Sequence, residues 1–594
     1  MSAGRATWKA YLAAVREQAG DAGRRAVVAG AAAALGRAVS WRPRQSLELA
    51  RWTPAAGVAA LDVPDALAGP GLLGRVLEAV TDPVARRADG AHYTPAPLAA
   101  GLLEAALVGV DERTLVPVCD PACGGGAFLL VAADRLAVAG LAPGTVVGHQ
   151  LWGVDLDPVA VAVADASLAC WAWLEGDRSG AHPGGHLAVT DALADPDPWA
   201  AVGAPDGFGL VVGNPPFQGQ LGRATARSPA ATAELRARFG PAVGAYTDAA
   251  ALFLLAATRL ARPGGRIALI LPSSILAARD ASAARAACVA DADLVGLWVA
   301  AEPVFAAGVR VCAPILARRA VGAGPEHAVS RWRGASFEAL PAAAAPADAS
   351  GWAALALAAH GVPEVAVRAV AGRVGDLASA TAGFRDQFYG LVPYVAEAPG
   401  DAGPDHLDAG LAPLVTTGLV DLGAIAWGRR PARFAGRTWQ RPAVDLAALR
   451  AGAPGLGRWV DERLVPKALV ASQTRVGEVV VDWSGRWVPS VPLVAITAPA
   501  EHLARLGAVV AAPVTAALGL ARSGGTALSD GALKLSARQV LDLPLPGDEA
   551  AWAEGTAALA AGDLDGFGAA MTAAYGLPTD HPVVAWWRAR LPAT

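Results

Sequence analysis

Short apolar runs alternate with longer segments in the middle of the chain, and this pattern predicts strands separated by helices. Between residues 89 and 320 the apolar runs indicate strands at 115–119, 151–155, 210–213, 266–271, 295–300 and 310–316. The segments between them favour helices at 95–108, 126–139, 158–174 and 247–262. Such alternation is typical of an α/β domain, in which a parallel sheet carries helices on both faces.

The two flanking regions have a different character. Residues 1–88 are rich in alanine and interrupted by prolines, which predicts a helical N-terminal region. Residues 321–594 contain shorter β-like runs at 478–483 and 488–497, and the last 45 or so residues favour helix. The segments 340–350 and 396–405 resemble linkers. We therefore expect three regions: 1–88, 89–320 and 321–594.

Composition narrows the class of protein. The chain has 594 residues, 54% of them hydrophobic, and a net charge of −4, which together exclude a largely disordered chain. Its uncharged runs are short or broken by glycine and proline, so we expect neither a membrane span nor a secretory signal. Five cysteines without a C-x-x-C pair argue against a disulfide framework or a structural zinc site. We expect a soluble, cytoplasmic protein without a metal.

Candidate chemistry begins at the ends of the predicted strands. Residues 115–130 read LVPVCDPACGGGAFLL: an apolar strand, Asp120, a glycine-rich turn and a helix. Such a turn lets backbone N–H groups approach a ligand at a helix N-terminus. Asp155 ends the strand at 151–155, where doubly wound sheets place an acid that binds ribose hydroxyls. Asp191 follows a third short apolar run.

The segment 210–217, LVVGNPPF, adds a different kind of chemistry. An apolar strand leads into Asn214-Pro215-Pro216-Phe217, and the two prolines stiffen the backbone. The Asn214 amide oxygen and the Pro215 carbonyl can then both point at one amino group. The alternative is a rigid turn that only closes a strand. The strand before it, the aromatic ring after it and the upstream glycine loop favour the chemical interpretation.

Taken together, these motifs resemble S-adenosylmethionine-dependent, adenine-N6 DNA methyltransferases of prokaryotic restriction-modification and defence systems. The order of motifs resembles the gamma group, and the runs 264–276 and 303–317 are similar to later motifs of the family. One departure is Gly125, where family members often have serine. The matching residues are His92-Tyr93-Thr94-Pro95, Asp120-Pro121-Ala122-Cys123-Gly124-Gly125-Gly126-Ala127-Phe128, Gly153-Val154-Asp155-Leu156-Asp157-Pro158, Thr190-Asp191-Ala192-Leu193 and Asn214-Pro215-Pro216-Phe217.

The resemblance implies a Rossmann-like class I methyltransferase core with a mostly parallel seven-stranded sheet. The helical N-terminal segment and a mixed α/β target-recognition region would flank this core. Asp155 would accept from the ribose hydroxyls of S-adenosylmethionine, and Asp191 from its adenine amino group. The implied cofactor-binding residues are Tyr93, Thr94, Asp120, Ala122, Cys123, Gly124, Gly126, Phe128, Asp155 and Asp191.

The implied catalytic residues are Asn214, Pro215, Pro216 and Phe217. Asn214 and the Pro215 carbonyl would bind the two N6 hydrogens of an adenine that has left the DNA stack. Phe217 and Phe305 are the candidates for stacking on that base. Positioning and aimed dipoles supply the catalytic effect, so no metal is required.

Double-stranded DNA is the expected partner, and an arginine-rich window in the C-terminal region is the candidate contact. Residues 422–444 contain no acid, and aromatic residues lie between their arginines. Guanidinium groups can bind phosphate or read guanine edges, although a solvated arginine-rich loop would look the same. The candidate DNA-binding residues are Arg429, Arg430, Arg433, Arg437, Arg441 and Lys467.

Two other functions remain open at this point. Methyltransferases acting on an RNA base or a protein glutamine also use Asn-Pro-Pro-aromatic, but they lack a C-terminal region of this length. A non-catalytic DNA-specificity protein is the second alternative, and the intact motifs argue against it. None of the three lysines has an acid two residues before it, so we expect no restriction activity in this chain. A separately encoded restriction endonuclease or defence proteins remain possible partners.

Overall fold

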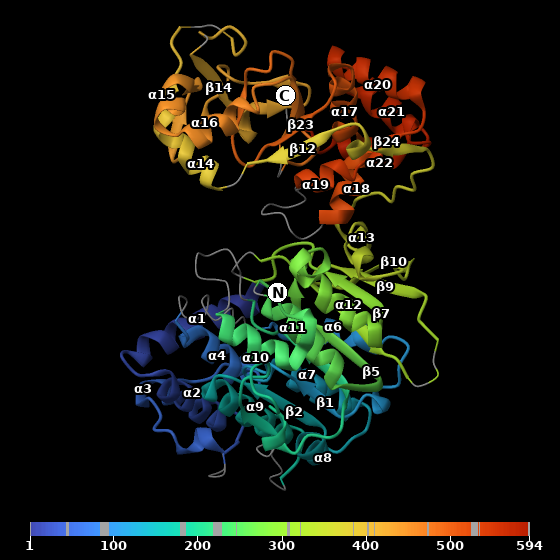
Figure 1. Cartoon of the computed structure of the whole chain (residues 1–594). Coiled ribbons are helices and arrows are strands. Elements are labelled where there is room, and N and C mark those ends of the chain that lie inside the picture. Colours follow the sequence, from blue (N-terminus) through green and yellow to red (C-terminus); the bar gives the residue numbers. More distant parts are fainter. Residues whose placement is uncertain are drawn as a thin grey trace. The chain divides into compact units, whose positions relative to one another are not determined.

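The computed structural model divides into two compact units, Met1–Leu355 and Ala356–Thr594, which are treated separately below (Figure 1). The C-terminal region was expected to begin after residue 320, so the fold places 35 further residues, 321–355, in the first unit. The structure describes residues 2–42, 47–82, 94–178, 186–217, 228–244, 246–305, 309–320, 322, 324–383, 385–400, 403–408, 410–471, 474–523, 533 and 535–591.

The N-terminal helices share a hydrophobic core with a helix of the predicted methyltransferase domain. Apolar side chains of the N-terminal helices pack with Val159, Val163 and Cys170 of α9. At the start of α9, Asp157 forms an ion pair of 2.7 Å with Arg24. The region predicted as helical is therefore part of the first unit's core. Its helices are α1 (Ser2–Ala19), α2 (Arg24–Ala38), α3 (Ala56–Ala59) and α4 (Leu72–Val80), and α9 spans Pro158–Leu174.

The first unit is built on one large sheet, with strand order β10-β9-β7-β8-β5-β4-β1-β2-β3. The strands from β3 to β5 are parallel, and β8 is antiparallel to its neighbours β5 and β7. The expected α/β class with a mainly parallel sheet is confirmed. Seven neighbouring strands reach from β7 to the edge strand β3. They are β1 (Val118–Asp120), β2 (Leu151–Asp155), β3 (Leu187–Val189), β4 (Phe208–Gly213), β5 (Ala261–Leu269), β7 (Ala292–Val299) and β8 (Val311–Arg318).

The described residues extend this sheet to ten strands, beyond the seven that were expected. The added strands are β6 (Leu271–Pro272), β9 (Ala328–Arg333) and β10 (Glu338–Ala344). β9 pairs in parallel with β7, and β10 returns antiparallel along β9 as the edge strand. The segment 340–350, expected to be a linker, therefore begins inside a strand.

Helices connect the strands and complete the core. Buried side chains of α6 and α7 pack with those of β1, β2, β4 and β8 in one apolar cluster. All four helices predicted in this region are present. The helices that follow the N-terminal set are α6 (Ala96–Leu107), α7 (Ala127–Val138), α8 (Pro143–His149), α10 (Pro229–Phe239), α11 (Ala249–Leu260), α12 (Ser282–Asp291) and α13 (Trp352–Leu355).

The second unit combines small sheets with a helical C-terminal end, as expected. One four-stranded sheet has the order β12-β23-β20-β21 and the other β13-β19-β14-β22. Their strands are β12 (Ser379–Ala382), β13 (Val395–Glu397), β14 (Leu411–Val415), β19 (Pro442–Asp445), β20 (Lys467–Val470), β21 (Val479–Asp482), β22 (Val488–Pro489) and β23 (Val494–Thr497). Two-stranded pairs are formed by β11 (Val370–Arg373) with β24 (Pro544–Pro546), β15 (Val420–Asp421) with β16 (Ala424–Ile425), and β17 (Ala432–Phe434) with β18 (Arg437–Trp439).

The helices of the second unit bury its largest apolar cluster, which includes Phe567, Met571, Tyr575 and Trp587. They are α14 (Arg385–Leu391), α15 (Leu446–Gly452), α16 (Pro454–Asp461), α17 (Ala500–Ala511), α18 (Pro513–Ser523), α19 (Ala537–Leu541), α20 (Glu549–Ala561), α21 (Leu564–Ala574) and α22 (Pro582–Arg588). Among the described residues no single helix meets the length and hydropathy of a bilayer span. The bent pair Ala500–Ala511 and Pro513–Ala521 meets them only when counted together.

Candidate active site

The residues with candidate chemistry in the first unit lie where parallel strands end at one edge of the sheet. Val118 of β1 pairs with Leu151 of β2 and with Leu210 of β4, so the three strands run side by side. Their carboxyl ends carry Asp120, Asp155 and, one residue beyond β4, Asn214. Ligands of open α/β sheets bind outside such carboxyl ends. The fold therefore gathers at this edge three residues that are 35 to 94 positions apart.

The glycine-rich turn between β1 and α7 follows a tight path that favours glycine. Gly124 and Gly126 have φ angles of +51° and +84°, in the left-handed region where a Cβ is strained. The amide of Cys123 donates to the Val154 carbonyl at 3.0 Å, which fastens the turn to β2. Ala122 is partly exposed, whereas Phe128 is buried in the first turn of α7.

Asp155 is held by the glycine-rich turn and keeps acceptor capacity. Its Oδ2 accepts from the Gly124 amide at 2.8 Å, and its Oδ1 accepts from the Asp157 amide at 2.9 Å. An ionised carboxylate can accept about four hydrogen bonds. These two bonds orient the group and leave room for about two more donors. Burial raises the pKa of Asp155, partly offset by these backbone hydrogen bonds.

Asp120 is a buried carboxyl group with very little compensation. Only 1% of the residue is exposed, and its Oδ1 accepts from the Ala122 amide at 3.0 Å. No ion pair to Asp120 is found among the described residues. Burial raises its pKa to about 8. A Cβ at Gly213 would lie 2.5 Å from this Oδ1, so the end of β4 makes room for the carboxyl group.

Asp191 lies directly after β3 in a compact turn. Its Oδ1 accepts from the amides of Leu193 at 2.8 Å and Ala194 at 2.9 Å. Within the described part of the chain, no hydrogen bond to its Oδ2 is found. The side chain is partly exposed. Asp191 therefore presents one oxygen that can accept from a ligand.

Asn214 is oriented by a residue from far earlier in the chain. Its Nδ2 donates to the Oγ1 of buried Thr94 at 3.1 Å. This bond fixes which end of the amide faces Thr94 and leaves Oδ1 as the acceptor end. The resemblance implied that Thr94 holds the cofactor, whereas the structure places it against Asn214. Tyr93, its predicted partner, lies outside the described residues.

The two aromatic residues proposed to stack on a base contact each other. The ring centroids of Phe217 and Phe305 are 6.0 Å apart, and the rings are inclined by 66° in an edge-to-face pair. Each residue is 7% exposed. Pro215 is also buried, and Pro216 is partly buried. The fold thus brings together the two residues singled out from segments 88 positions apart.

A close contact between the glycine-rich turn and α4 was not predicted. A Cβ at Gly125 would lie 2.8 Å from the Cα of Gly74 and 3.3 Å from a methyl group of Val163. The glycine that departs from the family pattern is therefore the residue that α4 packs against. The sequence contains one signal for this contact: Gly74 in a helical segment and Gly125 in the glycine-rich turn are both small enough for two backbones to approach closely.

The arginine-rich window of the second unit divides into exposed and buried members. Arg429, Arg433 and Arg437 are exposed, and Arg437 lies over the Trp439 ring at 4.7 Å. Arg430 is exposed but forms an ion pair of 2.7 Å with Asp421. Arg441 is only 9% exposed, with its guanidinium over the Trp427 ring at 5.2 Å. The prediction that Arg441 contacts DNA is wrong for this fold, because its charge is packed inside the unit.

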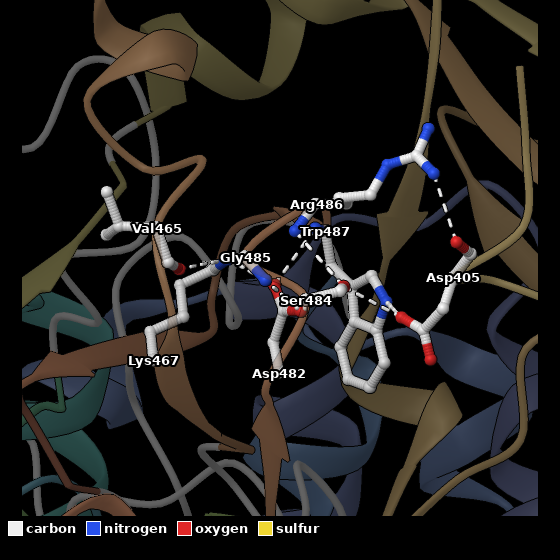
Figure 2. Close-up of polar contacts among 8 residues, drawn as sticks. All are labelled: Asp405, Val465, Lys467, Asp482, Ser484, Gly485, Arg486 and Trp487. Carbon is white, nitrogen blue, oxygen red and sulfur yellow. Dashed lines mark hydrogen bonds and ion pairs between the residues drawn. The ribbon is translucent and has the colours of Figure 1, made fainter. Parts of the chain in front are cut away.

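Lys467 is also wrong as a DNA contact, because it is completely buried. Its Nζ lies 2.5 Å from the Oδ2 of Asp482, and both side chains are 0% exposed (Figure 2). Asp482 also accepts from the amides of Gly485 at 2.8 Å and Trp487 at 2.9 Å. Burial lowers the pKa of Lys467, while Asp482 opposes that shift. The pair braces the turn between β21 and β22 and is unable to reach a ligand.

The same turn is fastened to a second loop, as Figure 2 shows. The Ser484 hydroxyl and the Trp487 indole N–H donate to Oδ1 of Asp405, at 2.8 and 2.9 Å. Arg486 donates to the main-chain carbonyl of Asp405 at 3.0 Å. Arg486 therefore has a structural role in this fold.

Comparison with solved structures finds matches to restriction-modification enzymes. The type IIL restriction-modification enzyme MmeI, solved in complex with DNA, gives a TM-score of 0.56 at 14% identity, covering 96% of this chain and 88% of that one. The type IIG restriction endonuclease BpuSI gives 0.44 at 11% identity, covering 99% and 80%. A methyltransferase subunit of a type I system from Streptococcus thermophilus gives 0.33 at 20% identity, covering 47% of this chain and 55% of that one. At these identities, the likeness to MmeI supports the fold.

Comparison with protein families gives a more specific result. Residues 71–322 match the model of the N-6 DNA methylase family, and this range contains every candidate active-site residue named above. A search of curated proteins found no match. The resemblance seen in the motifs is thereby confirmed for residues 71–322, the segment that matches this family.

Proposed function

We propose that the protein is a site-specific, adenine-specific DNA methyltransferase that transfers a methyl group from S-adenosylmethionine to adenine N6. The observation that carries the proposal is the grouping of Asp120, Asp155 and Asn214 at one sheet edge, within the residues that match the N-6 DNA methylase family. The protein would serve as the modification component of a restriction-modification or phage-defence system. A separately encoded nuclease or defence protein would then be its partner.

The acceptors at the sheet edge fit the donors of S-adenosylmethionine. Asp155 has about two acceptor positions left for the ribose hydroxyls, and the Oδ2 of Asp191 can accept from the adenine amino group. Asp120 is the candidate partner of the methionine ammonium group, because a cation would favour its ionised form. The backbone of Gly124 and Gly126 allows close approach of the ligand. When bound, the cofactor supplies an electrophilic methyl group.

The catalytic role falls to two acceptors at the end of β4. The Oδ1 of Asn214 and the carbonyl of Pro215 bind the two hydrogens of the target amino group and direct its lone pair toward the methyl group. Thr94 fixes the Asn214 amide, and the proline pair stiffens the backbone. Such preorganised dipoles lower the barrier without reorganising during the reaction.

The target base must leave the DNA stack to reach this edge, at a cost of a few kcal/mol. Phe217 and Phe305 offer aromatic faces that offset part of this cost. Because the rings contact each other edge to face, at least one must rotate before a planar base lies between them. The proposed stacking therefore includes a local rearrangement.

The decisive experiment is single-turnover methyl transfer by the Asn214→Ala variant to adenine-containing duplex DNA. Loss of a positioned dipole of this kind typically lowers the rate by about 10²–10³. Cofactor affinity, measured by calorimetry, should stay at the parent value, whereas the matched variant Asp155→Asn should lose it. Methylation by Asn214→Ala at the parent rate would mean that Asn-Pro-Pro-Phe is only a rigid turn.

The substrate class needs its own test. Labelled-methyl transfer with duplex DNA, RNA and protein substrates separates the adenine enzyme from the RNA-base and glutamine alternatives. Digestion of the methylated DNA to nucleosides should then yield N6-methyladenine and no N4-methylcytosine. The chain should not cut DNA by itself, and metal-dependent cleavage by the purified protein would contradict this part of the proposal.

DNA binding is assigned to the exposed part of the arginine-rich window. Arg433 is exposed on β17, and no ion pair to it is found among the described residues. An arginine that binds a phosphate should contribute about one unit to the salt slope of DNA binding. Arg433→Ala should therefore reduce affinity and slope, whereas Arg538→Ala, an exposed arginine on α19, should change neither. Unchanged binding by Arg429→Ala, Arg433→Ala and Arg437→Ala combined would identify the window as a solvated loop.

A further inference from the structure

A single arginine holds the main chain that follows Asp191. From α10, the Nη1 of Arg238 donates to the carbonyl oxygens of Ala192 at 2.9 Å, Leu193 at 2.8 Å and Asp195 at 2.5 Å. The guanidinium is always charged, and hydrogen bonds from a charged donor are stronger than neutral ones. Arg238 thus gathers three carbonyls of one short segment around one nitrogen.

The same segment orients the Asp191 carboxylate. Leu193 donates its amide to the Oδ1 of Asp191, while its carbonyl accepts from Arg238. Thr190 closes the segment, because its hydroxyl donates to the Oδ2 of Asp195 at 2.8 Å. Any shift of this segment would therefore turn the carboxylate of Asp191 and redirect its other oxygen.

The main chain at Arg238 is itself held in place. Its main-chain carbonyl accepts from the Nη1 of Arg259 on α11 at 2.8 Å. Two side chains of α10, Leu235 and Phe239, are buried. The carboxylates of Asp195 and Asp191 favour the charged guanidinium, against the cost of its partial burial. The helix thus gives the arginine a rigid base from which to hold the segment.

We infer that Arg238 is a positioning residue for the adenine of the cofactor: by binding the carbonyls of Ala192, Leu193 and Asp195, it aims the Oδ2 of Asp191 at the adenine amino group. The inference rests on the proposed function, in which Asp191 accepts from that amino group. α10 is also the next helix after the catalytic motif among the described residues. Arg238 therefore connects α10, which follows the catalytic motif, with the segment after β3 that carries Asp191.

The test compares two ligands that differ at the adenine amino group. S-adenosylhomocysteine has the amino group, and S-inosylhomocysteine has a carbonyl oxygen in its place. Calorimetry on the full chain gives the affinity for each and hence the preference for adenine. Arg238→Met keeps the length of the side chain without its donors, and Arg238→Lys keeps charged donors. Arg236→Met is the matched control, because Arg236 lies on the same helix and donates to Val243 instead.

We expect Arg238→Met to weaken S-adenosylhomocysteine binding by about ten- to a hundredfold, the range for loss of charge-assisted hydrogen bonds. S-inosylhomocysteine should weaken less, so the preference for adenine shrinks. Arg238→Lys should recover a large part of the preference, and Arg236→Met should leave it unchanged. Thermal unfolding of each variant establishes that the chain is folded. If Arg238→Met does not fold, the ligand preference of Arg238→Lys tests the inference instead.

Two results separate failure of the inference from failure of the proposed function. Equal loss of both ligands in Arg238→Met, or a parent-like preference in both Arg238 variants, would overturn the inference and leave Arg238 a purely structural residue. Asp191→Asn should abolish or reverse the preference, because an amide can donate to the inosine carbonyl. A parent-like preference in Asp191→Asn would instead overturn the role of Asp191 in the proposed function.

Discussion

Each unit of the protein contains a fully buried carboxyl group, and the two groups have opposite surroundings. In the second unit Asp482 accepts from the Lys467 ammonium group and from the amides of Gly485 and Trp487, so its charge is paired and hydrogen-bonded. In the first unit Asp120 accepts from one backbone amide, and the nearby charge is that of Asp155, another acid. Both carboxyl groups are equally buried, but only Asp482 has a cation and several hydrogen-bond donors to offset the cost of burying it.

The difference indicates which carboxyl group serves structure and which serves a ligand. A buried charge that is paired and hydrogen-bonded stabilises a unique geometry, and its removal costs stability. A buried carboxyl without a cation is held in its neutral form and becomes ionised when a cation arrives. Asp482 belongs to the first kind. Asp120, at a sheet edge within the segment that matches the N-6 DNA methylase family, is expected to belong to the second.

The largest expected effect comes from breaking the ion pair in the second unit. Lys467→Met leaves the Asp482 carboxylate buried without its cation, which typically destabilises by about 3–5 kcal/mol. Urea denaturation followed by tryptophan fluorescence should show this loss in the second unit's transition. Lys467→Met with Asp482→Asn should recover part of it, because the buried charge is gone and the turn keeps an acceptor. DNA affinity of the folded fraction should not change, and a change there would restore Lys467 as a DNA contact.

The features of the fold that could be predicted from the sequence are those marked by local sequence patterns. The strand at 151–155 and the helix at 158–174 were predicted with the bounds of β2 and α9, because apolar runs and a proline mark their ends. The approach of Asp120, Asp155 and Asn214 also followed from the pattern, since carboxyl ends of parallel strands meet at one edge. These features depend on local sequence and on a general rule of topology.

Features that depend on a distant partner could not be predicted. β10 was hidden in a segment of alanine and proline, because an exposed edge strand has no buried face to mark it. Lys467 is an ordinary cation until the fold places it against Asp482, fifteen residues later. Arg238 carries no motif at all, and its role exists only through three carbonyls some 45 residues earlier in the chain.

The second effect concerns protons at Asp120. Burial raises the pKa of Asp120 to about 8, from an ordinary value of 3.8. Between pH 4 and pH 8, roughly, the folded protein therefore keeps a proton on Asp120 that the unfolded chain has lost. The free energy of unfolding should therefore fall as pH rises through this window, by at most about 1.4 kcal/mol per pH unit from this group. Asp120→Asn should remove that slope, which urea denaturation at pH 5, 6, 7 and 8 would measure.

Binding of an ammonium-bearing cofactor should expel the same proton. At pH 6.5 calorimetry in two buffers with different ionisation enthalpies should show release of up to about one proton in the parent protein. Asp120→Asn should show none. Identical binding enthalpies of the parent protein in both buffers would mean that Asp120 stays neutral beside the ligand.

The third effect tests the packing of α4 against the glycine-rich turn. Gly125→Ser, the residue common in the family, would place a side chain against the Gly74 backbone, and overpacking of this kind costs about 1–3 kcal/mol. The melting temperature of the first unit and the cofactor affinity should both fall. Gly69→Ser is the control, because no atom lies within 4 Å of a Cβ at Gly69. Equal melting temperatures and cofactor affinities of the two variants would show that α4 can move to accommodate the serine side chain without loss of stability.

The smallest effect separates two roles for Thr94. Thr94→Val keeps the shape of the side chain but removes the acceptor of the Asn214 amide, a hydrogen bond worth about 1 kcal/mol. If Thr94 orients Asn214, the single-turnover rate should fall by roughly fivefold while cofactor affinity stays constant. Thr94→Ser, which keeps the hydroxyl, should retain most of the rate. If the resemblance is right that Thr94 holds the cofactor, the affinity should fall instead, and the rate at saturating cofactor should remain. This result bears on the contrast between Asp482 and Asp120. If Thr94 orients Asn214, the sheet edge combines one structural hydrogen bond with carboxyl groups, Asp120 and Asp155, whose oxygens can still accept from a ligand.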